Sequence, residues 1–496
     1  MDVSEYSRMD AVALADLVRT KQVTAVELGR IAVNAVKSLN PELNAVVSVN
    51  EDLVENLAFQ EPHTGVLSGV PILNKDLTPE EGSLLEMGSE LTRGFVSPYT
   101  CEFLRKLLAA GVTNIGRSTT LEFGLASVTE SRIAGVTRNP WDTERTPGGS
   151  SGGAAAMIAA GAVPVATGSD GGGSIRSLGA HCGIVGLKPT RGRISQAPLP
   201  DDPISGLAVH FVLTCSVRDT AVALDVTLGL APGDAYGFQP PAGAFTLSLH
   251  PPKRKLRIGY TTTSWGGDRA SRETSEGVVI ALRMLAEQGH AVQEARPEFA
   301  EEAFAKATLD IWCTNTAFAI DDLAHQMGRK QGDENLQSST MAFYRHGLTV
   351  SSSDILSALS VFNDVNLSVG RFFGEYDLLV TPTCMTTAPL IGDVQCDPVG
   401  VLDAAAWSKK MNGIDAFMPI FNTTGHPAIS LPLHWSEQGL PVGVQFVAPF
   451  GDEATLLQVG SFFEEALPWN NRPPDLRRWF DEVVHAQRRR IHSQSP

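Results

Sequence analysis

Two glycine-rich runs mark the centre of the chain: Arg145-Thr-Pro-Gly-Gly-Ser-Ser-Gly-Gly-Ala-Ala-Ala156 and Gly168-Ser-Asp-Gly-Gly-Gly-Ser-Ile-Arg176. Glycine loses more backbone entropy on folding than any other residue. A dense run of it therefore indicates backbone geometry closed to other residues, or main-chain amides that approach a ligand closely. Three kinds of structure use such runs: tight turns at strand ends, a phosphate-binding loop, and an oxyanion hole.

The residues around these glycines favour the oxyanion hole. Neither run has the Gly-Lys-Ser/Thr ending of a Walker loop or the G-x-G-x-x-G spacing that opens a dinucleotide-binding helix. An oxyanion hole would direct main-chain N–H groups at developing negative charge, here those of Gly171, Gly172, Gly173 and Ser174. It also places a hydroxyl at the end of the same loop, so Ser174 is the predicted nucleophile.

A serine nucleophile needs a base, and one candidate arrangement is the histidine-containing triad. Gly149-x-Ser151-x-Gly153 matches the nucleophile elbow of α/β hydrolases. Such an elbow follows an apolar strand, however, whereas residues 139–147 are polar and include two prolines. His181 and His426 are more typical of structural histidines. The match is therefore interpreted as coincidental.

Lys75 is the alternative base. It directly follows the apolar run Val70–Leu73, which is expected to form a strand. Active sites of α/β proteins collect at the carboxyl ends of such strands. Burial there would lower the lysine pKa from about 10.4, because desolvation disfavours the charged form. A neutral Lys75 could then accept a proton from Ser174 through a second hydroxyl.

Several motifs together resemble the amidase signature family. Beside the two glycine-rich runs they are Gly69-Val-Pro-x-x-x-Lys-Asp76, Gly183-x-x-Gly-Leu-Lys-Pro-Thr190 and Asn422-x-Thr-Gly-x-Pro-Ala-x-Ser-Leu-Pro432. The resemblance runs from about residue 8 to about 468. It implies a Ser–cisSer–Lys triad with Ser174 as nucleophile, Ser150 as the bridging serine after a cis peptide bond, and Lys75 as base. It also implies amide hydrolysis through an acyl-enzyme, with no metal or organic cofactor.

The same resemblance assigns supporting roles and substrates. Ser151 would stabilise its loop, and Asp170 and Arg176 would brace the oxyanion loop. Cys313 falls where family members that open cyclic amides of nylon-6 units have a cysteine lining the substrate site. Cyclic or linear 6-aminohexanoate oligomers are therefore the expected substrates. Two alternatives remain open. The substrate could be a general aryl or aliphatic amide or a carbamate, or the chain could be the amidase subunit of a tRNA-dependent amidotransferase.

The order of apolar and helical patterns predicts an α/β fold. Strands are expected at 45–49, 70–73, 112–115, 256–260, 292–295, 377–380, 428–432 and 442–447, and helices at 102–110, 218–229, 273–288 and 453–467. These elements predict a mixed, mostly parallel central sheet with helices on both faces, and the resemblance implies that this is the amidase-signature fold. We expect one domain over residues 1–496, with a catalytic core at about 60–230 and 377–468 and a helical pocket region at about 297–375.

Composition limits the remaining possibilities. The formal net charge of −16 disfavours a nucleic-acid partner, because phosphate binding needs a basic surface. The six cysteines lack the two-residue spacing of zinc or redox sites, which favours a reduced, cytoplasmic compartment. No secretory signal pattern or membrane-length apolar run is present, so no membrane partner is expected. The expected partner is a small amide substrate, and a homodimer is compatible with the sequence.

Overall fold

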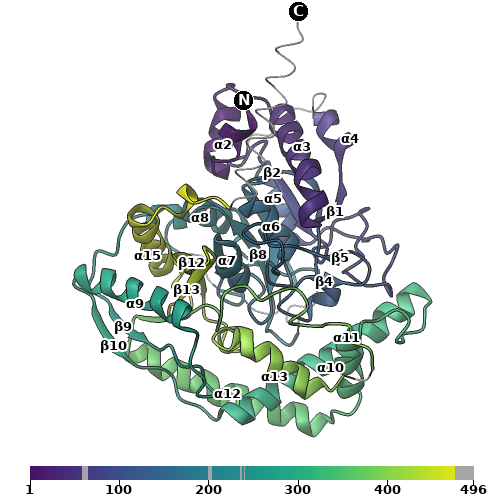
Figure 1. Cartoon of the computed structure of the whole chain (residues 1–496), viewed down its shortest axis with the longest axis vertical. Helices are drawn as coiled ribbons and strands as arrows, with labels where there is room; N and C mark the ends of the chain where they lie inside the picture. The colour runs from purple at the N-terminus through teal and green to yellow at the C-terminus, as the bar shows by residue number, and fades with distance from the viewer. Residues whose placement is uncertain (58–64, 199–203, 235–236, 239–240, 401, 475–496) are drawn as a thin grey trace, which may run out of the picture.

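The computed structural model describes residues 1–57, 65–198, 204–234, 237–238, 241–400 and 402–474. An 11-stranded sheet crosses this part of the chain in the order β1-β3-β2-β6-β8-β7-β12-β13-β11-β9-β10 (Figure 1). Its strands are β1 (Val46–Val49), β2 (Pro71–Lys75), β3 (Thr113–Ser118), β6 (Val165–Asp170), β7 (Val185–Lys188), β8 (Val209–Thr214), β9 (Arg257–Tyr260), β10 (Ala291–Glu294), β11 (Leu378–Pro382), β12 (Ala428–Trp435) and β13 (Pro441–Val447). The predicted α/β fold with a mixed sheet is confirmed.

The predicted majority of parallel strands is wrong. Among the described strands of this sheet, four pairings are parallel (β2–β3, β2–β6, β9–β10 and β9–β11) and six are antiparallel. A parallel pair needs a crossover of a dozen or more residues. Only residues 436–440 connect β12 to β13, so these two strands must form an antiparallel hairpin.

Helices pack on both faces of the sheet, as the central strands show. A Cβ built on Gly443 of β13 would lie 2.4 Å from the Ala180 Cβ of α7 (Arg176–Cys182). One built on Gly277 of α9 (Arg272–Glu287) would lie 2.9 Å from Val442 of the same strand. Neighbouring strand residues point to opposite faces, so α7 and α9 cover opposite sides of β13.

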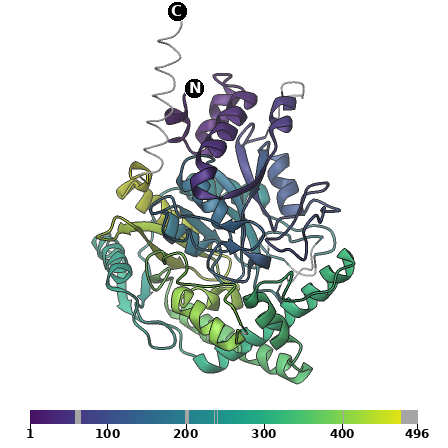
Figure 2. The same ribbon diagram turned by 45° about the vertical axis from the view of Figure 1, so that its right-hand side comes forward.

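The remaining helices form two groups at opposite ends of the molecule (Figures 1 and 2). The N-terminal group comprises α1 (Val3–Tyr6), α2 (Ala11–Arg19), α3 (Ala25–Leu43) and α4 (Glu51–Asn56). A capping box formed by Thr24 and Glu27 begins α3. The other group comprises α10 (Glu301–Met327), α11 (Ser338–Gly347), α12 (Ser352–Glu375) and α13 (Ala404–Asp415).

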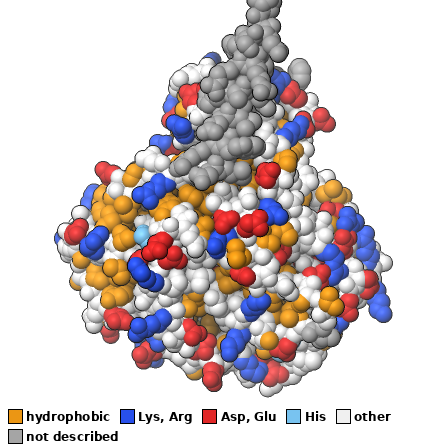
Figure 3. Space-filling view, viewed as in Figure 1, with side chains coloured by type: hydrophobic (Ala, Val, Ile, Leu, Met, Phe, Trp, Pro, Cys, Tyr) orange, Lys and Arg blue, Asp and Glu red, His pale blue; other side chains and the backbone are white. Residues whose placement is uncertain are grey.

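Five further α-helices and a two-stranded ribbon lie in the described part of the chain. They are α5 (Glu102–Ala109), α6 (Gly152–Ala159), α8 (Val217–Thr227), α14 (Pro419–Thr423), α15 (Glu453–Ala466) and the two-stranded ribbon β4 (Glu130–Ser131) and β5 (Gly135–Val136). Within the described ranges, no helix is both long and apolar enough to cross a membrane. Acidic and basic side chains are interspersed over the face shown in Figure 3, so no large field of one sign dominates it.

Candidate active site

The first glycine-rich run places Ser150 at the N-terminus of α6. The Gly149–Ser150 peptide bond is cis, as the resemblance implied. A Cβ built on Gly149 would lie 2.1 Å from the Val128 carbonyl oxygen, so no side chain fits there. The glycine thus lets two backbone segments of the chain pack closely, which differs from the approach of an amide to a ligand that the sequence suggested.

Lys75 lies at the carboxyl end of β2, and its side chain reaches Ser150. Its Nζ donates to Ser150 Oγ at 2.8 Å and to Ser169 Oγ at 2.9 Å. Ser169 comes close because β2 pairs in parallel with β6, with Leu73 opposite Ala166. Ser169 was not predicted as a site residue, since only the pairing of the two strands brings it to the amine.

The environment of Lys75 favours the neutral form of its amine. The residue is 0% exposed. Burial lowers the pKa of its amine to about 7, although the nearby Asp170 charge opposes the shift. A large fraction of Lys75 is therefore neutral near pH 7, and a neutral amine can take a proton from a hydroxyl.

Ser174 lies in the loop between β6 and α7 and is partly exposed. The preceding Gly173 has φ +141, and a Cβ there would lie 2.9 Å from Met418 Sδ, so both conformation and space require glycine. Gly171 and Gly172 are also partly exposed. Among the described residues, no hydrogen bond joins Ser174 to Ser150.

Ser177 connects the two serine loops. Its hydroxyl donates to the Gly173 carbonyl at 2.9 Å and lies 3.4 Å from the Gly149 carbonyl. Those two glycines immediately precede Ser174 and Ser150. Ser177 was not among the predicted residues, because a serine in the first turns of a helix carries no sequence signal for such a bridge.

Asp170 and Arg176 form a fully buried ion pair behind the oxyanion loop. Arg176 Nη2 lies 2.9 Å from Asp170 Oδ1, and both side chains are 0% exposed. Burial would raise the pKa of Asp170, but the Arg176 charge and the hydrogen bonds outweigh it and lower the pKa to about 2. Asn422 donates to Asp170 Oδ1 at 2.9 Å, and Gln445 accepts from Arg176 Nη1 at 2.8 Å.

Asn422 and Gln445 were not predicted as site residues, although both lie in apolar segments where a buried amide is a usable signal.

Ser151 makes longer hydrogen-bond contacts than the residues described above. Its hydroxyl lies 3.4 Å from the Ser169 amide nitrogen and 3.5 Å from the Ser169 carbonyl oxygen. It lies beside the predicted triad, between α6 and the end of β6.

A cavity opens in front of Ser174 and encloses about 650 Å³ of empty space, including its mouth. Its described lining comprises Gly124, Leu125, Ala126, Ser127, Gly172, Ser174, Thr308, Leu309, Trp312, Phe343, Ser408, Met411, Asn412, Asp415 and Pro419. The cavity thus lies between the catalytic core and the helices α10, α11 and α13.

The structure places Cys313 behind this wall. Its side chain is 0% exposed and packs in a cluster with Leu309 and Phe343, both of which line the cavity. The adjacent Trp312 also lines the cavity. The contact of Cys313 with substrate remains a prediction. At this point of the cavity, the described wall is formed by the indole of Trp312.

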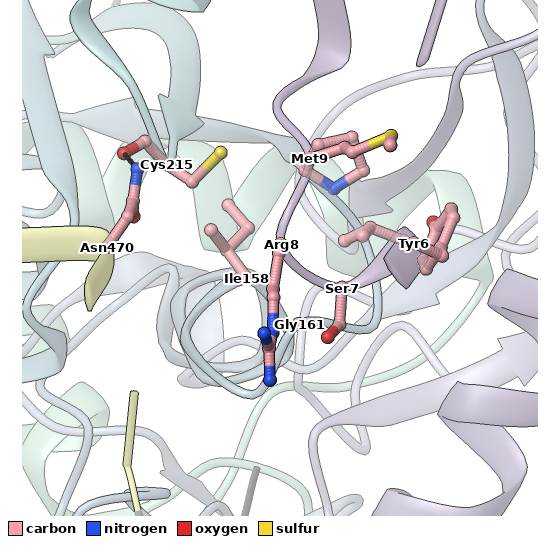
Figure 4. A pocket seen from close by; sticks show the side chains of 10 residues that line it. Tyr6, Ser7, Arg8, Met9, Ile158, Gly161, Cys215 and Asn470 are labelled. Atoms are coloured by element: carbon pink, nitrogen blue, oxygen red, sulfur yellow. Dashed lines mark hydrogen bonds between the residues drawn. The ribbon is translucent and has the colours of Figure 1, made fainter. Parts of the chain in front are cut away.

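A separate hollow lies where the N-terminal segment crosses α6 (Figure 4). Tyr6, Arg8, Ile158 and Cys215 are among its lining residues, and Asn470 donates to the Cys215 carbonyl at 3.1 Å. None of the predicted catalytic residues lines this hollow. The cavity beside Ser174 is therefore the candidate active site.

Comparison with known proteins places this geometry in a family. The family model described as Amidase matches residues 27–457. The chain is 35% identical over 479 residues to 6-aminohexanoate-cyclic-dimer hydrolase of Pseudomonas sp. (strain NK87), covering 94% of this chain and 96% of that protein. It is 34% identical over 487 residues to lipoamidase of Enterococcus faecalis, covering 93% of this chain and 64% of that protein.

A solved structure agrees with the sequence comparison. The structure of 6-aminohexanoate cyclic dimer hydrolase complexed with substrate matches with a TM-score of 0.89 and 33% identity, covering 95% of this chain and 99% of that one. Family model, relatives and fold agree over nearly the whole chain. The chain belongs to the amidase signature family and is a hydrolase that acts on carbon–nitrogen bonds.

Proposed function

We propose that this protein hydrolyses amide bonds with Ser174 as nucleophile, Ser150 as proton relay and Lys75 as base. The observation that supports it most directly is the 2.8 Å hydrogen bond from the buried Lys75 amine to Ser150 Oγ. Among the described residues, the hydrogen-bond partners of this amine are both hydroxyls. Burial makes its charged form costly despite the nearby Asp170, so the amine is partly neutral near pH 7.

The reaction then has two halves. As Ser174 attacks the substrate carbonyl, its proton passes to Ser150 while the Ser150 proton passes to Lys75. The N–H groups of residues 171–174 hold the oxyanion; losing one such donor typically costs about 3–4 kcal/mol. The relay next protonates the leaving nitrogen, since an amine anion is too basic to depart alone. Water, deprotonated by the same relay, finally releases the acyl group from Ser174.

Cyclic or linear 6-aminohexanoate oligomers are the proposed substrates. Apolar side chains from the helical layer and the loop before β4 line the cavity, among them Leu125, Leu309, Trp312, Phe343 and Met411. Such a wall suits a polymethylene chain, which gains free energy by leaving water. The resemblance to 6-aminohexanoate-cyclic-dimer hydrolase supports the same substrate class.

Two alternatives use the same triad. Aryl or aliphatic amides and carbamates also place a carbonyl beside Ser174, and the apolar wall accepts an acyl group such as that of a lipoyl amide. A glutamine-using amidotransferase subunit would need a cation for the α-carboxylate. None of the described residues that line the cavity is Lys, Arg or His, so the cavity offers that carboxylate no counter-charge.

The test is a hydrolysis screen of the purified chain. Substrates are the cyclic 6-aminohexanoate dimer, the linear dimer, an aryl amide, a carbamate and glutamine. Ser174→Ala should abolish turnover and labelling by a fluorophosphonate, while Ser360→Ala, an exposed serine on α12, should change neither. Turnover retained by Ser174→Ala would refute the nucleophile. Glutaminase activity that appears only with a co-purified partner would favour the amidotransferase.

A further inference from the structure

Asp415 is the single carboxylate among the described residues that line the cavity. It is the last residue of α13, and only 7% of the residue is exposed. The Ser127 hydroxyl hydrogen-bonds its Oδ2. Its Oδ1 is buried and has no hydrogen-bond partner among the described residues. Leaving a buried carboxyl oxygen without a hydrogen bond is unfavourable. Because Asp415 lines the cavity in front of Ser174, a donor group of a bound ligand would supply the missing hydrogen bond.

The backbone fixes Asp415 relative to the nucleophile. The Asp415 carbonyl accepts from the Met418 amide at 2.9 Å. The Met418 carbonyl in turn accepts from Arg176 Nη1 at 3.0 Å. Arg176 follows Ser174 by two residues and is itself held by Asp170. A short series of main-chain and buried contacts therefore holds the carboxyl and the nucleophile in one frame.

We propose that Asp415 binds a second N–H group of the substrate, at the end of the acyl chain remote from the amide being cleaved. This inference rests on the proposed function and specifies its substrate class. In a linear 6-aminohexanoate oligomer that group is the terminal amine. In the cyclic dimer it is the N–H of the second amide. Both are donors, and a carboxyl oxygen accepts from either.

Charge in the cavity agrees with this assignment. Burial raises the pKa of Asp415 well above its ordinary value; the Asp170 charge adds to this and Arg176 opposes it. A substrate ammonium beside Asp415 would favour the ionised carboxyl and form a buried ion pair. A substrate carboxylate at the same end would lose its hydration there, would disfavour the ionised form of Asp415, and would find no described cationic side chain in the lining to balance its charge.

Three anilides of equal chain length test the terminal amine: 6-aminohexanoyl, hexanoyl and 5-carboxypentanoyl p-nitroanilide. For the wild-type enzyme we expect kcat/KM to be highest for the amino compound, by about tenfold over hexanoyl, and lowest for the carboxy compound. Asp415→Asn should reduce the amino-to-hexanoyl ratio to near one. Asn412→Ala, a neutral residue of the same lining, should leave that ratio unchanged whatever it does to the rates.

A second comparison tests the other proposed donor, the N–H of the second amide in the cyclic dimer. The cyclic dimer is compared with a ring of equal size that carries a single amide. Asp415→Leu, which removes the acceptor at similar side-chain size, should reduce the preference for the ring with two amides. Equal wild-type kcat/KM for the amino and hexanoyl anilides together with equal values for the two rings would overturn the proposal, as would an anilide ratio unaltered by Asp415→Asn or a ring ratio unaltered by Asp415→Leu. The wild-type ratios decide the matter even if the variant does not fold. Failure of the proposed function looks different: no compound is hydrolysed and Ser174 is not labelled.

Discussion

At the scale of single residues, the chemistry depends on how burial changes Lys75. Its amine has hydroxyl partners at 2.8 and 2.9 Å and no exposed surface. An ammonium there lacks the water that stabilises it in solution, so the proton is released more easily. In the proposed mechanism, the protein thus obtains a base near neutral pH from a side chain that is normally a cation.

The pH dependence of turnover tests this directly. Only neutral Lys75 can accept the relayed proton, and burial lowers its pKa to about 7. The kcat/KM of an uncharged amide should therefore rise with pH through about 7 and level off above it. The measurement is a pH–rate profile with hexanoyl p-nitroanilide. A profile that is flat across this range would contradict the assigned base.

The two adjacent serines provide a matched pair. Ser150 accepts directly from Lys75, whereas the nearest contacts of the Ser151 hydroxyl are at 3.4 and 3.5 Å. Ser150→Ala removes the relay and should lower kcat by about 10²–10⁴-fold. Ser151→Ala should cost far less. Equal losses in both variants, measured at equal thermal stability, would mean that the loop as a whole and not the relay is needed.

At the scale of elements, the β6–loop–α7 unit carries Ser174, the proposed nucleophile. The strand ends at Asp170 and the helix begins at Arg176, so the ion pair closes the loop that contains residues 171–174. Because both charges are fully buried, each depends on the other. Removing one leaves an uncompensated charge in an apolar environment.

Arg176→Met should therefore destabilise the protein by about 3–5 kcal/mol, because Asp170 loses its counter-charge. Urea unfolding measures the change. Arg19→Met provides the control, since the Arg19–Asp16 pair is 71% and 57% exposed and water screens it. A loss for Arg176→Met no greater than for Arg19→Met would show that the buried pair is not required for the stability of the fold.

At the scale of the whole molecule, the proposed catalytic residues and the opposite wall of the cavity lie in different layers. Lys75, Ser150 and Ser174 come from the sheet and its loops, whereas α10, α11 and α13 supply the opposite wall of the cavity. Trp312 of α10 links the two layers, because its ring lies 3.0 Å from the position of a Cβ on Gly171.

Trp312→Ala should alter selectivity without altering the proton chemistry. Loss of the indole widens the cavity, so we expect KM to rise most for the most apolar anilides, by about tenfold. The inflection of the pH–rate profile near pH 7 should not shift, because the substitution does not change Lys75. A shifted inflection, measured by the same pH–rate profile, would mean that the helical layer also controls the burial of the base.

The sequence by itself determined the α/β class, and its motifs predicted the triad residues and the oxyanion loop. These features are local: a glycine that admits no side chain, a lysine after an apolar strand and a capping box each leave a pattern within a few residues. Strands β6 and β7 were not predicted, because Gly168 and Gly186 interrupt their apolar patterns. β8 was also missed, although Val-His-Phe-Val-Leu-Thr carries a strand signal.

Only the tertiary structure decided the rest. Three features depend on residues far apart in the chain: the antiparallel majority of strand pairings, the contacts of Ser169, Asn422 and Gln445, and the position of Asp415 in the cavity. Helical periodicity predicts a helix near Cys313 but cannot show that Trp312 faces the cavity. The face that each helix turns inward is set by packing against distant elements, and a single sequence does not record which elements those are.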